Sequence, residues 1–291
     1  LSVSPPGLVP TDVRGKSVGA NLLSRWTRRL ASDSELSMQF YFDRTDRGFG
    51  IGREIRDTVD WDGQHRFPIG ERNEIVWGAG YRYSVDAFTQ NPDFQFSEPS
   101  VGLRLFSAFV QDEISLVPDR LRVTLGVKVE HNDFTGFEQM PSARMSWSPG
   151  EHHTVWGAVS LAIRTPARSE RGLTYYVTPP PSLPSLPVPL LIQARGNPDF
   201  GSEELVAYEL GYRVQLHPRL TLDTATFYHD YDDLWSATLL PAELGISPAA
   251  EPYLLFPATP ENKGFGETYG VEVAATWQPV DSWRWQAGYT F

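Results

Sequence analysis

Hydrophobic and polar side chains alternate along most of this chain with a period of two. In 121–130 (LRVTLGVKVE), every odd-numbered residue is Leu or Val, and every even-numbered residue is polar or glycine. Successive side chains of a β-strand point to opposite faces, so such a segment has one apolar and one polar face. Helical spacing of the apolar residues fits none of these segments. The pattern predicts an all-β protein.

The same alternation predicts about twelve strands. They are expected at 18–30, 35–46, 53–66, 72–86, 101–117, 120–134, 137–148, 152–164, 203–216, 219–237, 264–278 and 282–291. Many are longer than the roughly 5–6 residues usual in soluble sheets. They reach the roughly 9–11 residues that a tilted strand needs to cross a bilayer.

The connections between these strands alternate in length. Short ones are expected at 31–34, 67–71, 118–119, 149–151, 217–218 and 279–281, and mostly longer ones at 47–52, 87–100, 165–202 and 238–263. The connection near 134–137 is the exception, because it is short. Sorting of short and long connections to opposite ends is typical of outer-membrane barrels, whereas soluble sandwiches and propellers have shorter strands and unsorted connections. We therefore predict an antiparallel up-and-down transmembrane β-barrel.

The order of the connections also predicts that the barrel is partial. If the short turns lie in the periplasm, the first strand begins and the last strand ends on the external side, whereas bacterial barrels normally keep both termini in the periplasm. The alternate aromatic residues Trp285, Tyr289 and Phe291 imitate the last strand of a complete barrel. Any strand that rises to the external side can end in this way. We expect 1–291 to be one barrel domain truncated at both ends.

Composition narrows the function. The formal net charge is −11, so the chain has no cationic surplus for nucleic acid, and it contains no cysteine for disulfides or thiol chemistry. Mean hydropathy is −0.32, and no apolar run approaches the roughly 18 residues of a transmembrane helix. Strands that are apolar on one face only are compatible with such a low hydropathy.

Candidate catalytic and metal-binding residues have simpler interpretations. No G-x-S-x-G motif occurs, and Asp112 and Glu113 are adjacent in a strand, so they face opposite sides and cannot act as an acid–base pair. The pair His152–His153 follows a short turn and is expected to be solvated. A calcium site is conceivable at Asp230, Asp232 and Asp233, but we favour a hydrated rim. We expect no enzyme activity, no catalytic residue, no metal site and no cofactor.

Five segments, in order, resemble the barrel of TonB-dependent outer-membrane receptors. They are FSAFVQDEISLVPDRLRVTLGVKVEHND (106–133), WGAVSLAIRTPARSE (156–170), GNPDFGSEELVAYELGYR (196–213), LTLDTATFYHDYDDLW (220–235) and NKGFGETYGVEVAATWQP (262–279). Phe200 stands where this family usually has Leu. The segments cover about half of the chain, and their turn lengths agree with the predicted strands.

The resemblance implies a barrel of 22 strands around an N-terminal plug, of which about twelve strands are present here and the plug is absent. It implies the outer membrane of a Gram-negative bacterium, contact with its lipid, and energised uptake of a large ligand, most often a ferric siderophore. The TonB–ExbB–ExbD complex would be contacted through an N-terminal segment missing from this chain. Two alternatives remain, namely a passive porin-like channel and a structural or adhesive β-protein.

Candidate ligand-binding residues lie at the start of the longest connection. They are Arg164, Arg168, Arg171, Tyr175 and Tyr176. Guanidinium groups and aromatic rings there could hold an anionic, partly aromatic iron chelate by charge-assisted hydrogen bonds and stacking. The simpler interpretation is a hydrated rim, or for Arg164 an ion pair with plug carboxylates. The proline-rich run 177–190 is expected to form a stiff arm over the barrel mouth.

Overall fold

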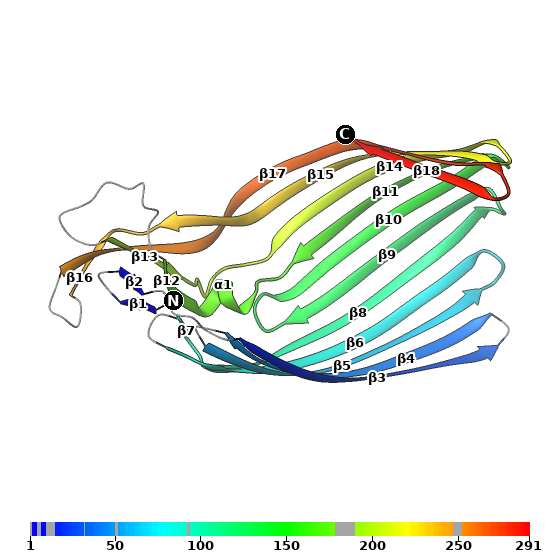
Figure 1. Ribbon diagram of the computed structural model, residues 1–291. Helices are drawn as coiled ribbons and strands as arrows, with labels where there is room; N and C mark the ends of the chain where they lie inside the picture. Colours follow the sequence, from blue (N-terminus) through cyan, green and yellow to red (C-terminus); the bar gives the residue numbers. More distant parts are fainter. Residues whose placement is uncertain are drawn as a thin grey trace.

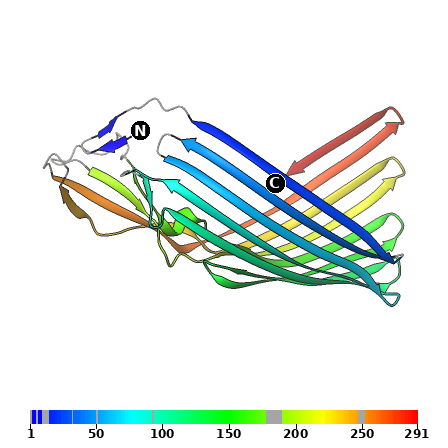
Figure 2. The ribbon, with the colours of Figure 1, turned by 90° about the horizontal axis from the view of Figure 1, so that it is seen from below.

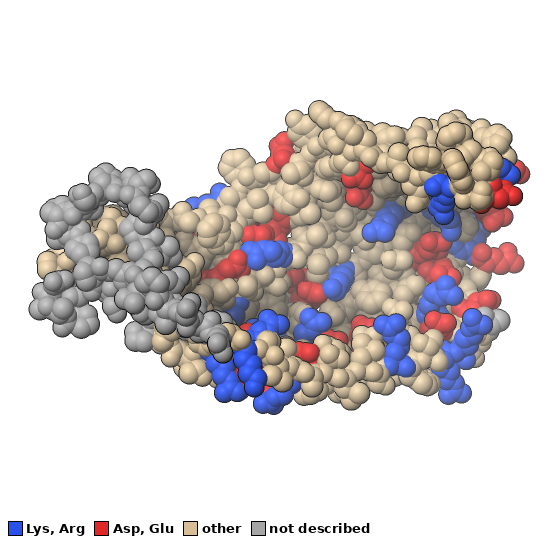
Figure 3. All heavy atoms as spheres, viewed as in Figure 1, with Lys and Arg blue, Asp and Glu red and all other residues tan. Residues whose placement is uncertain are grey.

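The chain folds into a long, strongly curved sheet, as two views of the ribbon show (Figure 1, Figure 2). The space-filling view shows that one side of this sheet is hollowed (Figure 3). The computed structural model describes residues 2–4, 7–9, 15–31, 33–49, 52–91, 94–177, 190–246 and 252–291. Most of the proline-rich run expected to form an arm, 178–189, lies outside these residues. No helix in the described part is long and apolar enough to cross a membrane.

Twelve strands form the curved wall. They are β3 (Lys16–Ala31), β4 (Ser34–Phe49), β5 (Gly52–Ile69), β6 (Asn73–Thr89), β8 (Ser100–Val117), β9 (Leu121–Asn132), β10 (Gly136–Gly150), β11 (His153–Arg164), β14 (Glu203–His217), β15 (Leu220–Leu239), β17 (Pro252–Val280) and β18 (Trp283–Thr290). Each pairs antiparallel with the next strand of the wall, as the alternation predicted. Among the described residues β3 pairs only with β4 and β18 only with β17, so the wall is an open sheet.

The remaining elements are short. They are β1 (Ser2–Ser4), β2 (Gly7–Val9), β7 (Phe94–Phe96), α1 (Arg168–Gly172), β12 (Leu173–Val177), β13 (Leu190–Arg195) and β16 (Glu243–Ile246). The turn expected at 67–71 is displaced, because β5 continues to Ile69 and the chain reverses at Gly70, whose φ of 64° suits a residue without a side chain.

The register gives the wall one apolar and one polar face. On the convex face, Trp61, Tyr81 and Phe106 are register partners in neighbouring strands and keep 41–49% of their surface exposed. On the hollow face, Asp60 and Arg82 are partners, and their side chains form an ion pair of 2.7 Å. Lys, Arg, Asp and Glu side chains gather across this hollow (Figure 3). A one-residue slip would exchange the two faces, so the alternation fixes the register.

The geometry agrees with the prediction that Asp112 and Glu113 cannot act as an acid–base pair. Asp112 lies on the convex face between Ile75 and Leu125, and it accepts a hydrogen bond of 2.7 Å from the Asn73 amide. Glu113 lies on the hollow face and forms an ion pair with Arg122 at 3.3 Å. The two carboxylates therefore have separate partners on opposite sides of the sheet.

The wall has no central apolar core. Among the described side chains, and apart from the buried prolines Pro166 and Pro257, the buried apolar ones are Phe96, Leu191, Phe200, Val214 and Leu255. Four of these belong to the end of the wall that carries the long connections, here called the mouth, and only Val214 lies in a wall strand near the short turns. The stability of the wall therefore depends on strand pairing and on an apolar solvent for its convex face.

Strands at the mouth form a bridge where the sequence predicted only long connections. β7 pairs antiparallel with β12, β12 with β13, and β13 runs parallel to Leu254–Ala258 of β17. The prediction of a connection over 238–263 is wrong in part, because β15 continues to Leu239, β16 pairs with β17, and β17 already begins at Pro252. Period-two alternation is weak there because these strands do not separate lipid from a hollow.

The bridge passes over the turn between β9 and β10, where the wall reaches least far toward the mouth. β9 and β10 are joined by a short turn, in which the Asn132 side chain accepts hydrogen bonds from the backbone N–H groups of Phe134 and Thr135. The connections on either side of this turn are longer, and β7 and β12 join them by three register pairs. The exceptional short connection noted in the sequence therefore lies beneath the bridge.

We predict that a cation is tolerated on one face of β8 and not on the other. Val110→Arg places a charge on the convex face near the middle of the strand, and it should lower the free energy of unfolding in phospholipid bilayers by about 2–4 kcal/mol. The control Gln111→Arg adds the same charge on the hollow face opposite Gly126 and should change it little. Denaturant titration of the protein in vesicles measures both. Equal losses would contradict the assignment of the faces.

Candidate ligand-binding site at the mouth

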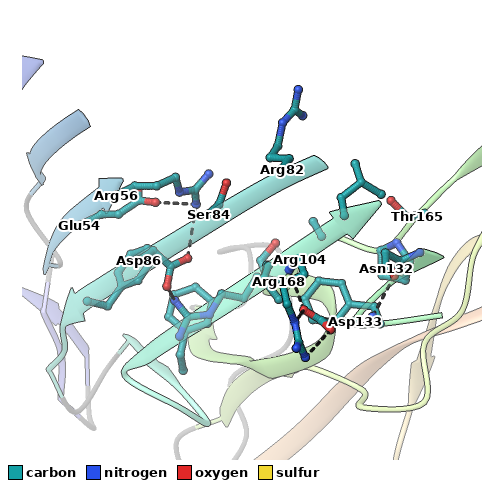
Figure 4. A pocket seen from close by; sticks show the side chains of 18 residues that line it. Glu54, Arg56, Arg82, Ser84, Asp86, Arg104, Asn132, Asp133, Thr165 and Arg168 are labelled. Atoms are coloured by element: carbon teal, nitrogen blue, oxygen red, sulfur yellow. Dashed lines mark hydrogen bonds and ion pairs between the residues drawn. The ribbon is translucent and has the colours of Figure 1, made fainter. Parts of the chain in front are cut away.

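A cavity of about 450 Å³ lies at the mouth beneath α1 (Figure 4). Its walls come from β5, β6, β8, the short turn after β9 and the start of the long connection after β11. The polar lining residues are Glu54, Arg56, Arg82, Ser84, Asp86, Arg104, Asn132, Asp133, Thr165, Arg168 and Ser169. Phe88, Phe96, Leu103, Leu105 and Phe134 add an apolar part. The cavity thus combines hydrogen-bond donors with aromatic and aliphatic surface.

Every arginine in this lining has a carboxylate partner. Arg82 pairs with Asp60 at 2.7 Å, and Arg104 pairs with Asp133 at 3.0 Å. The side chains of these two arginines nevertheless remain 54% and 67% exposed. An exposed guanidinium has five N–H donors, so it can bind a second acceptor while it keeps its first partner.

The Arg104–Asp133 pair joins the start of β8 to the short turn. Burial alone would raise the pKa of Asp133, but hydrogen bonds from the Arg104 side chain and backbone N–H hold that pKa below its ordinary value. The carboxylate is therefore charged at neutral pH, and it orients Arg104 at the edge of the cavity.

Arg168, one of the predicted ligand-binding residues, is largely enclosed. Its side chain is only 11% exposed, and it donates hydrogen bonds to the Asp86 carboxylate and to the carbonyl oxygen of Glu98. The guanidinium lies over the rings of Phe96 and Phe88, at 4.3 and 5.3 Å from their centres. Burial lowers the pKa of Arg168, although an arginine remains charged at neutral pH.

Arg164 fixes the base of the long connection. It forms ion pairs with Glu203 at 2.5 Å and with Glu170 at 2.9 Å. Glu203 also accepts a hydrogen bond of 2.7 Å from the backbone N–H of Trp235, and Glu170 accepts one from Ala167. Arg164 therefore pairs with carboxylates of this chain, and it holds β11, α1, β14 and β15 together.

Arg171 and the segment that begins with Gly196–Asn197–Pro198 fix the long connection at a second point. Arg171 donates to the carbonyl oxygen of Phe200 at 2.8 Å, and Phe200 is fully buried. The Asn262 side chain bonds the backbone of Gly201, Ser202 and Asp233. Motifs that are far apart in the sequence thus meet at one point, where they shape the mouth.

The two tyrosines differ in exposure. Tyr176 packs against Leu191 and Leu255 in the small apolar cluster of the bridge. Tyr175 keeps 39% of its surface exposed on β12. The structure thus engages Arg164, Arg168, Arg171 and Tyr176 with the chain itself, although the Arg164 side chain keeps 47% of its surface exposed. Of the two tyrosines, Tyr175 is the more accessible. That the five contact a ligand stays a prediction.

Sequence reasoning missed Asp86, Phe88 and Phe96, which surround Arg168. Asp86 and Glu98 are separated from Arg168 by 82 and 70 residues. Period-two patterning carries no information about contacts across such distances. The one usable signal was the short connection near 134–137, because it lets the connections on its two sides meet above it.

The histidine and aspartate clusters have partners in the wall. The His152 ring bonds the Gln215 side chain at 3.2 Å, and the His153 ring bonds the Tyr212 hydroxyl at 2.7 Å. Asp233 has a φ of 54° at a β-bulge between Tyr231 and Leu234. Over the described part of the chain, no three His, Asp or Glu side chains are grouped as metal ligands.

Comparison with solved structures shows the fold. The siderophore receptor PirA from Pseudomonas aeruginosa superposes with a TM-score of 0.71 at 18% identity, covering 94% of this chain and 50% of that one. PirA from Acinetobacter baumannii gives a TM-score of 0.68 at 14% identity, covering 96% and 53%. A mutant ferric enterobactin receptor from P. aeruginosa, in complex with enterobactin, gives 0.69 at 17% identity, covering 96% and 52%.

A curated relative is similar in sequence. The chain is 25% identical to the iron-regulated outer membrane virulence protein of Vibrio cholerae over 224 residues. This alignment covers 77% of this chain and 32% of that protein. The chain therefore spans about a third of that relative and about half of each solved receptor.

The family itself follows from the match of residues 10–291 to TonB dependent receptor-like, beta-barrel. This match includes all twelve wall strands and the bridge, and its family consists of receptors and transporters rather than enzymes. The apolar convex face and the open, antiparallel wall agree with it. The chain belongs to the TonB-dependent receptor-like β-barrel family, and its wall lies in the outer membrane of a Gram-negative bacterium.

Proposed function

We propose that the protein carrying this chain imports ferric siderophores across the outer membrane with energy delivered through TonB, ExbB and ExbD. The chain supplies part of one barrel domain, namely its wall and the external mouth, and the TonB contact is made by a segment outside it. The observation that carries the proposal is the family match over residues 10–291. The siderophore receptors among the similar solved structures support the choice of ligand.

The chemistry of the mouth suits such a ligand. Iron chelates of this kind are large, anionic and often aromatic, so they need hydrogen-bond donors and flat apolar surfaces that face outwards. Arg82 and Arg104 offer exposed guanidinium groups at the cavity, and Tyr175 offers an exposed ring on the bridge. Charge-assisted hydrogen bonds and stacking can therefore act together.

Uptake of the ligand is expected to need TonB, whereas binding of the ligand at the cell surface is expected to occur without it. Cells that express the whole receptor under iron limitation should accumulate ⁵⁵Fe from at least one member of a panel of catecholate and hydroxamate siderophores. A strain without TonB should bind the same complex at its surface and accumulate none, because a plugged barrel opens only when the plug is pulled. Filter assays of bound and internalised ⁵⁵Fe measure the two steps.

A receptor deletion is the control for this experiment, because other receptors of the same cell can import iron. Accumulation that continues without TonB and falls with the size of the solute would instead identify a passive porin-like channel. Absence of both binding and uptake for every complex would exclude siderophore import.

Removal of the exposed ring at the mouth should weaken binding. Tyr175→Ala is expected to raise the Kd of the bound ferric complex about 3–10-fold, since an aromatic contact contributes roughly 0.5–1.5 kcal/mol. Tyr208→Ala removes a similarly exposed ring from the convex face of β14 and should leave the Kd unchanged. Titration of ⁵⁵Fe complex onto whole cells at 4 °C measures both. Equal effects would place the ligand away from the bridge.

A further inference from the structure

Among the described residues, the joint of the bridge with the fewest register pairs is that between β7 and β12, with three against four between β12 and β13 and five between β13 and β17. Three register pairs among the described residues, from Leu173↔Phe96 to Tyr175↔Phe94, join β12 to β7. Fifteen register pairs join the wall strands β6 and β8, from Asn73↔Ile114 to Ala87↔Ser100. We call the three-pair joint the seam. Because each pair adds backbone hydrogen bonds, the seam separates far more easily than any joint of the wall.

Arg168 closes this seam from the side of α1. It links α1 to Asp86 of β6 and to the carbonyl of Glu98, and it lies over the rings of Phe88 and Phe96. Next to it, the backbone N–H of Ser97 donates to the carbonyl of Gly172 at 2.7 Å. These contacts join the end of β6 and the connection that follows it to the connection after β11, so the Arg168 side chain latches the two sides.

The latch can open without stranding a buried charge. Asp86 is only 5% exposed, and loss of every cationic partner would be costly. However, Arg56 lies 3.6 Å from Asp86 on the other side, where Glu54 holds it at 2.6 Å. When Arg168 leaves, Arg56 remains beside the Asp86 carboxylate, and Arg168 itself moves into water.

The seam also lies on the route into the hollow. The cavity below α1 is bounded by Arg168, Phe96 and the turn residues Asp133 and Phe134, and the bridge runs across the mouth from the connection after β6 to β17. A ligand too large for the cavity can pass on this side only when the bridge moves. Separation of β7 from β12 is the movement that breaks the fewest backbone pairs.

We propose that Arg168 is a positioning residue that latches the bridge, and that the seam between β7 and β12 is the joint that opens when a ligand passes. The proposal rests on the function proposed above. It assigns Arg168 to the bridge and leaves ligand contact to the more exposed side chains of the mouth.

A reversible crosslink tests the seam in the whole receptor in its membrane. Gln95 and Thr174 are register partners, and the Cα separation of antiparallel partners, about 4.5–5.5 Å, lies in the range that a disulfide accepts. The chain has no cysteine of its own, so the pair Q95C/T174C forms a single crosslink within it. The matched control S142C/S160C links register partners of β10 and β11 inside the wall.

The oxidised seam pair should bind a ⁵⁵Fe-loaded catecholate siderophore as the parent does, but import it at least tenfold more slowly, and a reductant should restore uptake. The oxidised control pair should import at the parental rate. Uptake through the oxidised seam at the control rate would overturn the proposal. If the parent itself neither binds nor imports the complex, the proposed function is what fails for that ligand.

Hydrogen exchange measured without ligand then tests, independently of transport, whether the seam opens and whether Arg168 holds it closed. In the parent receptor, the amides of 94–96 and 173–175 should exchange at least tenfold faster than those of β6 and β8. Arg168→Gln should speed exchange at the seam further and leave the wall unchanged, and Arg168→Lys should restore most of the protection. Seam amides protected as well as the wall would overturn the opening, and no response to Arg168→Gln would overturn the latch.

Discussion

The structure depends on the pairing of backbone N–H and C=O groups between neighbouring strands. In a bilayer no water is available to these groups, so every strand that crosses must be hydrogen-bonded on both edges. The wall strands between β3 and β18 meet this demand by antiparallel registers, whereas β3 and β18 each keep one edge unpaired among the described residues. The same registers place aromatic residues on the lipid side and ion pairs such as Asp60–Arg82 in the hollow. Burial contributes little, since few side chains are enclosed.

The ends of the wall obey a different constraint, because water can satisfy their backbone groups. The connections there are free to pair with one another, and the short turn after β9 decides how they do so. It lowers the rim at one point, and the connections on both sides meet above it through β7 and β12. The buried cluster of Phe96 and Arg168 exists because this meeting excludes water from a small volume.

This difference explains what could be predicted from the sequence. All twelve wall strands were predicted, because a wall between lipid and a polar hollow imposes a strict period of two. The bridge was not, because β7, β12, β13 and β16 are short and have no lipid side. The positions of Arg164, Arg168 and Arg171 at the mouth were predicted from the length of the connection that they begin, but their partners were not. Glu203 is the register partner of Arg164 across β11 and β14, whereas Asp86 meets Arg168 only through the folding of the long connection.

Arg168 shows why residue type alone is a weak guide to ligand contact. An arginine in a long external connection fits an anionic ligand, and the same guanidinium group fits a carboxylate of its own chain and two aromatic rings equally well. The outcome is decided by burial. At 11% exposure Arg168 has no surface left for a ligand, whereas Arg104 at 67% does, although both are paired with aspartates. Recognition at the mouth is therefore expected from arginines that keep an exposed face, and the shape of the mouth from those that do not.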